Sequence, residues 1–153
     1  MKIVQWLEQH QHQVTSVSPQ CSLHEMLDVL LAARPSSTDV YVVDDEGRLL
    51  GHIPAQLIFS HYLAEHQPVQ SRRQLIHRVT CSNAEEMMEP HPFMARLDEE
   101  MDDVLPRQLQ QGIAELAVVD GKDRLCGVID LYSVARSLRA MDRVGSGNSL
   151  DNQ

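Results

Sequence analysis

The sequence predicts an α+β fold built from two copies of one β-α-β-β-α unit. The first observation behind this prediction is an internal repeat, because the segment that starts at Tyr41 aligns with the segment that starts at Ala117. The second is the pattern inside each copy, where short β-branched runs alternate with apolar residues at helical spacing. A chain of 153 residues with 42% hydrophobic content can bury a core of this kind.

Each repeated segment is predicted to form a β-hairpin. The two segments are YVVDDEGRLLGHI and AVVDGKDRLCGVI. In both, strand-forming residues flank a short turn rich in aspartate and glycine, which favours a tight hairpin. Seven positions are identical, where about one would be expected by chance. The identical pairs are Val42/Val118, Val43/Val119, Asp44/Asp120, Arg48/Arg124, Leu49/Leu125, Gly51/Gly127 and Ile53/Ile129.

In the first copy, a helix is predicted between an extended segment at 14–19 and the hairpin. Ser22 and Glu25 form a capping box that satisfies two backbone amides at the helix start. Pro35 ends the helix near Arg34, because the residue before a proline avoids helical geometry. A second helix follows the hairpin. The apolar residues that mark the two helices are Leu23, Met26, Leu27, Leu30 and Leu31, then Leu57, Ile58 and Tyr62.

The second copy repeats this order, with Met101 in the place of Leu23. Its first helix is predicted from about Asp98, and Pro106 inside it predicts a kink or an early break, since proline lacks an N–H and crowds the preceding turn. Gly112 suits a left-handed helix end, and Asp130 can cap the last helix. The apolar residues that mark these helices are Met101, Val104, Leu105 and Leu109, then Leu131, Val134, Ala135 and Leu138.

The predicted elements divide the chain into five parts. The N-terminal helix, with Ile3, Trp6 and Leu7, is expected to seal the module. The connector contains a short helix at AEEMM, which Ser82 or Asn83 caps. A basic group in the connector, Arg72, Arg73, His77 and Arg78, is either solvated or docks an acidic or phosphate-bearing partner. The parts are the N-terminal helix at 1–13, the first repeat at 14–64, the connector at 65–89, the second repeat at 90–140 and a disordered tail at 141–153.

Charge and composition exclude several classes of partner. A net charge of −9 argues against duplex DNA and anionic membranes, whose phosphates would repel most of the surface. No stretch approaches the roughly 20 apolar residues of a membrane span, and the N-terminus lacks the features of a signal peptide. Cys21, Cys81 and Cys126 form no paired motif, which suits a reducing compartment. The sequence therefore predicts a cytoplasmic protein with no nucleic-acid partner and no membrane insertion.

The sequence contains no convincing catalytic or metal-binding constellation. Serine, histidine and aspartate are plentiful, but no activating motif surrounds them, so we predict that the chain is not an enzyme. His10 and His12 are spaced so that they do not share a helix face, and no metal site is predicted. The acidic run from Asp98 to Asp103 is most simply a solvated helix start, where carboxylates complement the helix dipole.

The hairpins and the units around them resemble a tandem pair of CBS domains, the Bateman module, over about residues 14–140. The similar segments are VYVVDDEGRLLG, AVVDGKDRLCGVIDLYSV and AEEMM, the last of which resembles the Met-ended segment before the second domain of such pairs. The resemblance implies that the repeats pack through their sheets with pseudo-two-fold symmetry. It also implies a homodimer formed through the helices after the hairpins, with Leu57, Ile58, Leu131, Val134 and Leu138 as its apolar face.

The resemblance further implies a regulatory or sensing role toward an effector enzyme, channel or transporter, commonly through adenosine nucleotides bound between the repeats. The family's ligand signature is a Thr or Ser followed three residues later by an Asp. The first repeat has Pro54 and Leu57 there, which bind neither phosphate nor ribose. The second has Asp130, which repels phosphate, and Ser133, which bonds a hydroxyl weakly. An adenosine-type ligand is therefore expected in the second repeat's cleft, with S-adenosylmethionine or adenosine preferred over ATP.

Two alternatives remain open beside this interpretation. One is a regulatory domain that senses Mg²⁺, because VYVVDDEGRLLG also resembles the cytosolic domains of magnesium transporters. The other is a purely structural dimerisation or docking module. The cofactor is accordingly an adenosine nucleotide, S-adenosylmethionine or Mg²⁺, if one binds. The candidate ligand-binding residues are Thr15, Ser16, Tyr41, Met94, Glu115, Leu116, Ala117, Asp130 and Ser133.

Overall fold

The computed structural model describes residues 1–11, 13–33, 39–68, 71–73, 76 and 83–147. Each half of the chain forms a small sheet with helices on one side. The first half contains β1 (Ser16–Val17), α2 (Leu23–Ala32), β2 (Asp39–Val43), β3 (Leu49–Pro54) and α3 (Ala55–Glu65). The second half contains β5 (Met94–Arg96), α6 (Met101–Gln110), β6 (Glu115–Val119), β7 (Leu125–Asp130) and α7 (Leu131–Gly147).

Both halves follow the predicted β-α-β-β-α order. In each, the first strand runs parallel to the second, and the second pairs with the third as an antiparallel hairpin. The pairing is irregular between Val42 and Val43 and again between Val118 and Val119, so even this local irregularity is duplicated. A short strand, β4 (Glu89–Pro90), adds to the edge of the first sheet beside β3. The α+β class and both hairpins are confirmed.

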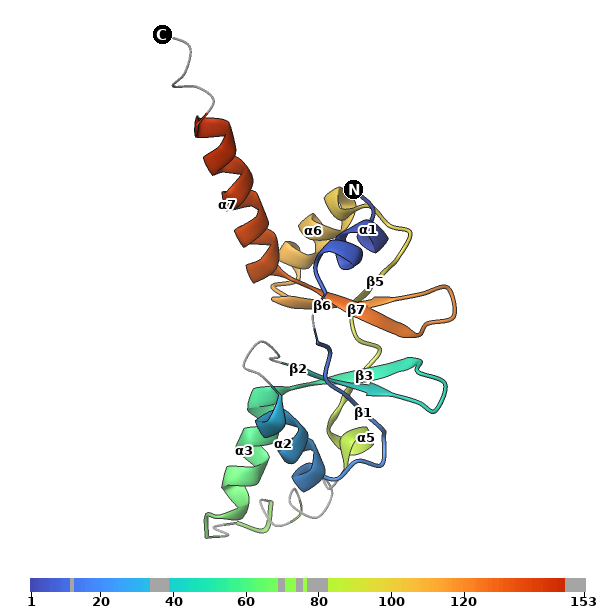
Figure 1. The fold of residues 1–153 in the computed structure, drawn as a ribbon. Helices are drawn as coiled ribbons and strands as arrows, with labels where there is room; N and C mark the ends of the chain where they lie inside the picture. The colour runs from blue at the N-terminus through green and yellow to red at the C-terminus, as the bar shows by residue number, and fades with distance from the viewer. Residues whose placement is uncertain (12, 34–38, 69–70, 74–75, 77–82, 148–153) are drawn as a thin grey trace.

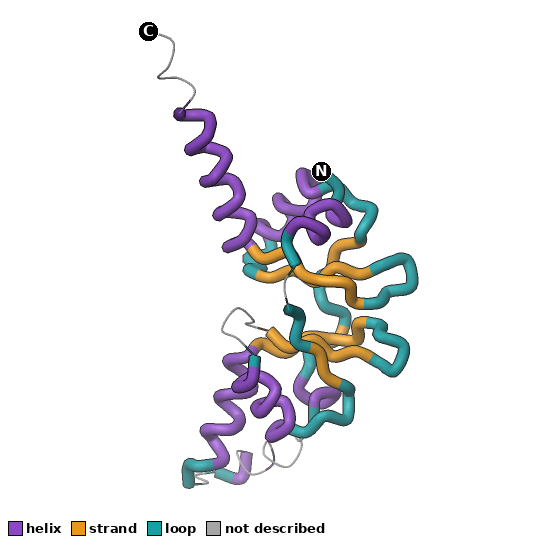
Figure 2. The backbone as a smooth tube through the Cα atoms, in the orientation of Figure 1, coloured by secondary structure: helices purple, strands orange, loops and turns teal. Residues whose placement is uncertain are grey.

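The two sheets face each other in the middle of the molecule, and the helices lie on their outer faces (Figure 1). Figure 2 shows the two layers of strands between the helices. A small core joins the sheets, with Tyr41 and Leu49 from the first and Ala117, Val119 and Val128 from the second. A larger core lies between each sheet and its helices. Packing of the repeats through their sheets is confirmed.

The turns of the two hairpins are bound to each other by a symmetric pair of backbone hydrogen bonds. The Leu49 amide donates to the Asp123 carbonyl at 2.9 Å, and the Leu125 amide donates to the Gly47 carbonyl at 3.0 Å. Leu49 corresponds to Leu125 in the repeat, and Gly47 corresponds to Asp123. The two bonds are therefore equivalent, as pseudo-two-fold symmetry requires. Gly47 and Asp123 have positive φ angles of 83° and 61°, so the corresponding turn position is left-handed in both copies.

Each turn is also held by the same internal ion pair. Nε of Arg48 lies 2.8 Å from Oδ2 of Asp44, and Nε of Arg124 lies 2.8 Å from Oδ2 of Asp120. The other carboxylate oxygen accepts the backbone amide of the same arginine. These bonds, the backbone one foremost, hold the pKa of both aspartates below its usual value. The aspartate and arginine that are identical in the two repeats therefore stabilise the hairpin turns.

The helix that precedes each repeat packs on the other repeat. The N-terminal helix α1 (Ile3–Gln9) lies against β7, with Ile3 and Trp6 buried in the second core. The connector helix α5 (Ala84–Met87) lies against β3 in the first core. The Ile3 amide donates to the Glu99 carbonyl at 3.0 Å, and the Ala84 amide donates to the Cys21 carbonyl at 2.8 Å. The prediction that an N-terminal helix seals the module is confirmed.

The predicted helix caps are present where the structure describes them. The Ser22 hydroxyl accepts the Glu25 amide at 3.2 Å, and the Glu25 carboxylate accepts the Ser22 amide at 3.3 Å. Asn83 Oδ1 accepts the Glu86 amide at 3.0 Å at the start of α5. The alternative cap, Ser82, lies outside the described residues.

Helix α6 differs from the prediction in its start, in its continuity and in its buried face. It begins at Met101 and continues to Gln110 with Pro106 inside it, so the expected early break is wrong, and a kink at Pro106 stays a prediction. Pro106 is exposed, and water can therefore bind the carbonyl that its missing N–H leaves free. Leu109, predicted to be buried, is 63% exposed. Gln108 is buried instead, and its Nε2 donates to the Ile129 carbonyl at 3.1 Å.

Replacing Pro106 with alanine is expected to leave the free energy of unfolding unchanged or to raise it by up to about 2 kcal/mol. An interior proline costs about 3 kcal/mol in a regular helix, and part of the gain is offset by the more flexible unfolded chain. Urea unfolding followed by circular dichroism measures the difference. A clear loss of stability in Pro106→Ala would show that the proline shapes the native backbone of α6.

The last helix is longer than predicted. Helix α7 continues from Leu131 to Gly147, so the prediction of a disordered tail is wrong for residues 141–147. The helical segment SLRAMDRV carries good helix formers up to Val144, and these extend α7 beyond the body of the protein (Figure 1). The rest of the predicted tail, 148–153, lies outside the described residues.

Candidate ligand cavity between the repeats

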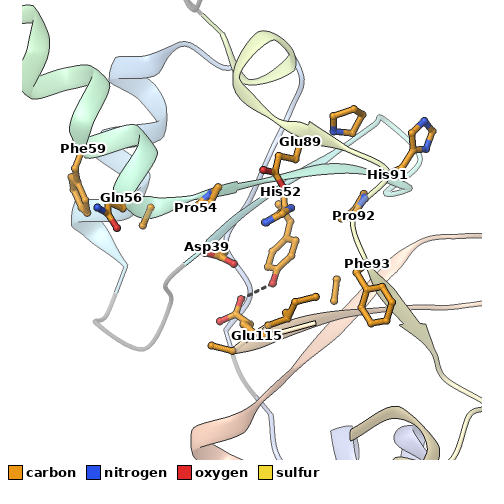
Figure 3. A pocket seen from close by; sticks show the side chains of 17 residues that line it. Asp39, His52, Pro54, Gln56, Phe59, Glu89, His91, Pro92, Phe93 and Glu115 are labelled. Atoms are coloured by element: carbon orange, nitrogen blue, oxygen red, sulfur yellow. Dashed lines mark hydrogen bonds between the residues drawn. The ribbon is translucent and has the colours of Figure 1, made fainter. Parts of the chain in front are cut away.

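A cavity of about 840 Å³ lies between the two repeats. Its walls come from β2, β3 and α3 of the first repeat, from the segment 89–93 that joins the repeats, and from the chain that enters β6. Phe59 lies at one end and Phe93 at the other, with Asp39, His52 and Glu115 between them (Figure 3). This volume is in the range of pockets that hold small organic ligands.

The charged side chains on the described cavity wall are acidic, and Tyr41, His52, Gln56 and His91 add neutral polar groups. Asp39, Glu89 and Glu115 contribute three carboxylates, and His52 and His91 are the histidines. No lysine or arginine lines the cavity within the part of the chain that the structure describes. With neutral imidazoles, the wall therefore carries negative charge, which repels phosphate groups.

One hydrogen bond connects the two repeats at the edge of the cavity. The Tyr41 hydroxyl donates to Glu115 Oε1 at 2.7 Å (Figure 3). Tyr41 is buried between the sheets, and burial, together with the Glu115 carboxylate, raises the pKa of its hydroxyl, which therefore remains a donor. The tyrosine thus fixes the position of the Glu115 carboxylate.

Asp39 and His52 contribute polar groups to the first repeat's wall, beside Tyr41 and Gln56. Burial raises the pKa of the Asp39 carboxyl, and the nearby His52 partly opposes this rise. Nδ1 of His52 is buried and has no hydrogen-bond partner among the described residues. A buried polar atom without a partner costs roughly 1–3 kcal/mol, so a ligand that bonds Nδ1 would recover part of that cost.

Comparison with known proteins identifies the fold. Residues 84–140, which comprise the connector helix α5 and the second repeat, match the family model of the CBS domain. Among solved structures, CBSX2 of Arabidopsis thaliana in complex with AMP has a TM-score of 0.70 at 21% identity, over 92% of this chain and 98% of that one. This chain has the fold of a CBS pair. No curated protein is similar enough in sequence to count as a match.

Two further solved structures show the same CBS-pair fold. The CBS domain-containing protein tm0935 from Thermotoga maritima has a TM-score of 0.69 at 22% identity, over 92% of this chain and 95% of that one. The CBS domain pair of MJ0100, in complex with 5′-methylthioadenosine and S-adenosylmethionine, has a TM-score of 0.67 at 18% identity, over 92% and 98%. The predicted tandem CBS arrangement is therefore confirmed at the level of the fold.

The described cavity is the cleft on the first repeat's side of the CBS pair. Pro54 lies on its wall, whereas Leu57 packs against the first core. Neither side chain supplies a polar atom to the cavity. The repeat symmetry predicts a second cleft on the side of the second repeat. Residues 113–115 on the wall of the described cavity correspond to 37–39 on the wall of that second cleft, and 37 and 38 lie outside the described residues. From the sequence, the adenosine-type ligand is expected in the second cleft, and this assignment stays a prediction.

The predicted site residues separate into different environments. Glu115, Tyr41 and Ala117 line the described cavity. Thr15 and Ser16 lie at β1, where Ser16 pairs with Tyr41, and Met94 pairs with Ala117 in the second sheet. Leu116 is fully buried in the second core, so its side chain does not reach a ligand there.

Asp130 and Ser133 bond to each other at the start of α7. The Ser133 amide donates to Asp130 Oδ1 at 2.9 Å, which is the predicted cap, and the Ser133 hydroxyl donates to Oδ2 at 2.7 Å. Because its proton is directed to Asp130, the hydroxyl can serve a ribose only as an acceptor. Whether this pair contacts a ligand stays a prediction.

The sequence did not indicate most of the cavity wall, and the unpredicted residues include Asp39, His52, Phe59, Glu89 and Phe93. Strand alternation could have indicated His52, because it shares a face of β3 with Pro54, two residues later. Glu89 and Phe93 gave no such signal, since the path of the connector depends on its packing against β3.

The apolar residues predicted to face outward do so only in part. Ile58 is fully buried and Val134 is 8% exposed, so both belong to the repeat cores, and their predicted place on a dimer face is wrong. Leu138 is 54% exposed, as predicted, and Met141 is 66% exposed on the next turn of α7. The exposed apolar surface therefore lies farther along α7 than predicted.

Neither metal ligation nor membrane insertion is indicated by the described part of the chain. Its histidine, cysteine, aspartate and glutamate side chains include no group of three that could hold a metal ion. Its helices include none with the length and apolar character needed to cross a membrane.

Proposed function

We propose that this CBS pair is a non-catalytic regulatory module that binds a small adenosine-type ligand between its repeats and reports it to a partner protein. The partner would be an effector enzyme, a channel or a transporter. The observation that carries the proposal is the cavity of about 840 Å³, which combines ring faces with hydrogen-bonding groups. Support comes from CBSX2, which was solved with AMP, and from MJ0100, which was solved with two adenosine derivatives.

An adenosine-type ligand is expected to raise the melting temperature of the protein, because a ligand that binds only the folded state adds its binding free energy to stability. At a ligand concentration 100 times Kd the gain is about 2.7 kcal/mol. Thermal-shift titration with adenosine, 5′-methylthioadenosine, S-adenosylmethionine, AMP, ATP and Mg²⁺ measures it. A response to none of the adenosine compounds would contradict the proposed function and favour a structural module.

Two variants assign the ligand to one of the clefts. Ala114 lies on the wall of the described cavity with an exposed side chain, so Ala114→Phe would fill that cavity without entering a core. Ala135 is exposed and is the counterpart of Phe59 in the second repeat, so we expect Ala135→Phe to crowd the other cleft. Loss of binding in Ala114→Phe alone supports the described cavity, and loss in Ala135→Phe alone supports the second cleft.

The two described cysteines support a role without thiol chemistry, and their free thiols fit the cytoplasmic location that we propose, since the cytosol keeps thiols reduced. Cys21 and Cys126 are free thiols. Partial burial raises the pKa of the Cys21 thiol to about 11, and a hydrogen bond with Glu25 adds to the effect. Partial desolvation also raises the pKa of the Cys126 thiol, although that residue lies at the surface. A raised pKa leaves little thiolate at neutral pH, and thiolate is the reactive form.

We further propose that two copies of the CBS pair associate through α7. Leu131, Val134, Leu138 and Met141 follow one another at spacings of three and four residues and form one stripe along the helix. The stripe starts in the second core and continues with Leu138 and Met141 onto the exposed part of α7, which projects from the body of the protein (Figure 1). Apolar residues in this arrangement suit a helix pair.

Replacing both Leu138 and Met141 with glutamate is expected to convert the dimer to a monomer, because four like charges would face one another across a small interface. Light scattering at tens of micromolar measures the mass. Ala140→Glu is the control, since Ala140 is exposed on another face of α7 and the change adds a glutamate to the same helix without entering the stripe. A natural chain that is already monomeric would contradict the proposed dimer.

A further inference from the structure

We propose that the cavity between the repeats selects a ligand that joins a flat ring to a positively charged group, and that Asp39 and Glu115 are the residues that select the charge. The inference rests on the proposed function and specifies its ligand class. It differs from the sequence-based expectation, which placed a ligand in the second repeat's cleft. The phosphate of AMP or ATP would be disfavoured in this cavity.

The charges on the wall support a cationic ligand. Glu115 and Asp39 face the cavity from the two repeats, Glu89 adds a third carboxylate, and the described wall contains no lysine or arginine (Figure 3). A phosphate entering here would meet three negative groups, whereas a sulfonium or ammonium group would be attracted to each of them. Glu115 is held in place by the 2.7 Å hydrogen bond from Tyr41, so its charge is already positioned.

The rings at the two ends of the cavity support a flat ligand group. Phe59 and Phe93 are 39% and 37% exposed, which leaves ring surface for stacking. Between them, Nδ1 of His52 is buried without a partner among the described residues, and it can bond a ring nitrogen or an amino group. A nucleoside base is a ligand group that uses both ring faces and hydrogen-bonding edges.

The guanidinium that lies over the Phe93 ring is already paired with a carboxylate. The Arg107 guanidinium lies 5.9 Å from the centre of the Phe93 ring. Its Nη2 also lies 2.7 Å from Oε1 of Glu99, outside the cavity wall. Arg107 therefore covers Phe93 without supplying an unpaired cation for a phosphate.

The experiment compares ligands that share adenosine and differ in charge. Isothermal titration calorimetry is run with S-adenosylmethionine, which is cationic, with 5′-methylthioadenosine, which is neutral, and with AMP and ATP. We expect S-adenosylmethionine to bind about tenfold or more tightly than 5′-methylthioadenosine, and AMP and ATP to bind more weakly than both. Added salt should weaken the binding of S-adenosylmethionine and leave that of 5′-methylthioadenosine nearly unchanged.

Isosteric variants separate charge selection from folding. Glu115→Gln and Asp39→Asn should each weaken S-adenosylmethionine about tenfold or more and change 5′-methylthioadenosine by less than about threefold. Glu115→Gln keeps an oxygen that can accept the Tyr41 hydroxyl. The control is Asp102→Asn, which removes the same charge from an exposed position on α6 outside the cavity and should leave both affinities unchanged.

Three outcomes would overturn the inference. AMP or ATP binding more tightly than S-adenosylmethionine, with binding lost in Ala114→Phe, would refute charge selection while the proposed function stands. Equal weakening by Asp102→Asn would show a general effect of net charge. Binding of none of the four compounds to the natural chain would remove the inference together with the proposed function.

Discussion

Trp6→Ala is expected to lower the free energy of unfolding by about 3 kcal/mol or more, the usual cost of truncating a buried tryptophan. Trp6 is 6% exposed in the second core and stacks on His10 at a centroid distance of 3.6 Å. Its Nε1 has no hydrogen-bond partner among the described residues, so the loss is one of packing. Because the tryptophan fluorescence disappears with the residue, urea unfolding is followed by far-ultraviolet circular dichroism.

The region that Trp6→Ala destabilises tests the role of α1 more directly than the total loss of stability does. Helix α1 covers the second repeat, so hydrogen exchange should accelerate in β6 and β7 before it does in β2 and β3. Val4→Ala is the matched control, since Val4 lies on the same helix and is 37% exposed, and it should cost less than about 1 kcal/mol. A loss below about 1 kcal/mol for Trp6→Ala would mean that α1 contributes little to the second repeat.

The local signals in the sequence were sufficient for most of the fold. The Asp44 and Asp120 turns could be recognised because each turn is held by bonds among residues within a few positions of one another. The capping box of Ser22 is local for the same reason. The continuation of α6 past Pro106 could not be predicted, because it depends on the burial of Met101, Val104 and Gln108 in the core of the second repeat, which includes strands distant in the sequence.

The candidate site was less predictable because it is assembled from both repeats. Glu115 was among the predicted residues, but its 2.7 Å bond with Tyr41 joins positions far apart in the sequence. The resemblance to CBS pairs predicts ligand contacts at the signature positions, which are Pro54 and Leu57 in the first repeat. The acidic groups that distinguish this cavity lie instead at Asp39 and Glu89, outside that signature. Their proximity follows from the packing of the two sheets and from the path of the connector.

Gly51→Ala is the second change expected to have a large effect, a loss of about 2–3 kcal/mol in the free energy of unfolding. A Cβ atom at this position would lie 2.6 Å from Sδ of Met88 and 2.7 Å from the carbonyl oxygen of Glu89. The carbonyl belongs to the backbone of β4, which pairs with β3 at Gly51 and Pro90, so it can move only if that pairing opens. Overpacking of this kind usually costs about 1–3 kcal/mol.

Gly127 is a matched comparison, since it occupies the same position in the second repeat. A Cβ there would lie 3.0 Å from Cδ2 of Leu7, a flexible side chain on α1, so Gly127→Ala should cost less than about 1 kcal/mol. Urea unfolding of both variants gives the difference. Since β4 carries Glu89 and Pro90 on the cavity wall, Gly51→Ala should also weaken the ligand that binds there, while Gly127→Ala should not. Equal stability losses in the two variants would contradict this prediction. They would show that β4 moves away from a Cβ atom as easily as the Leu7 side chain does, and that the stability of the first repeat does not depend on the close contact between Gly51 and the connector.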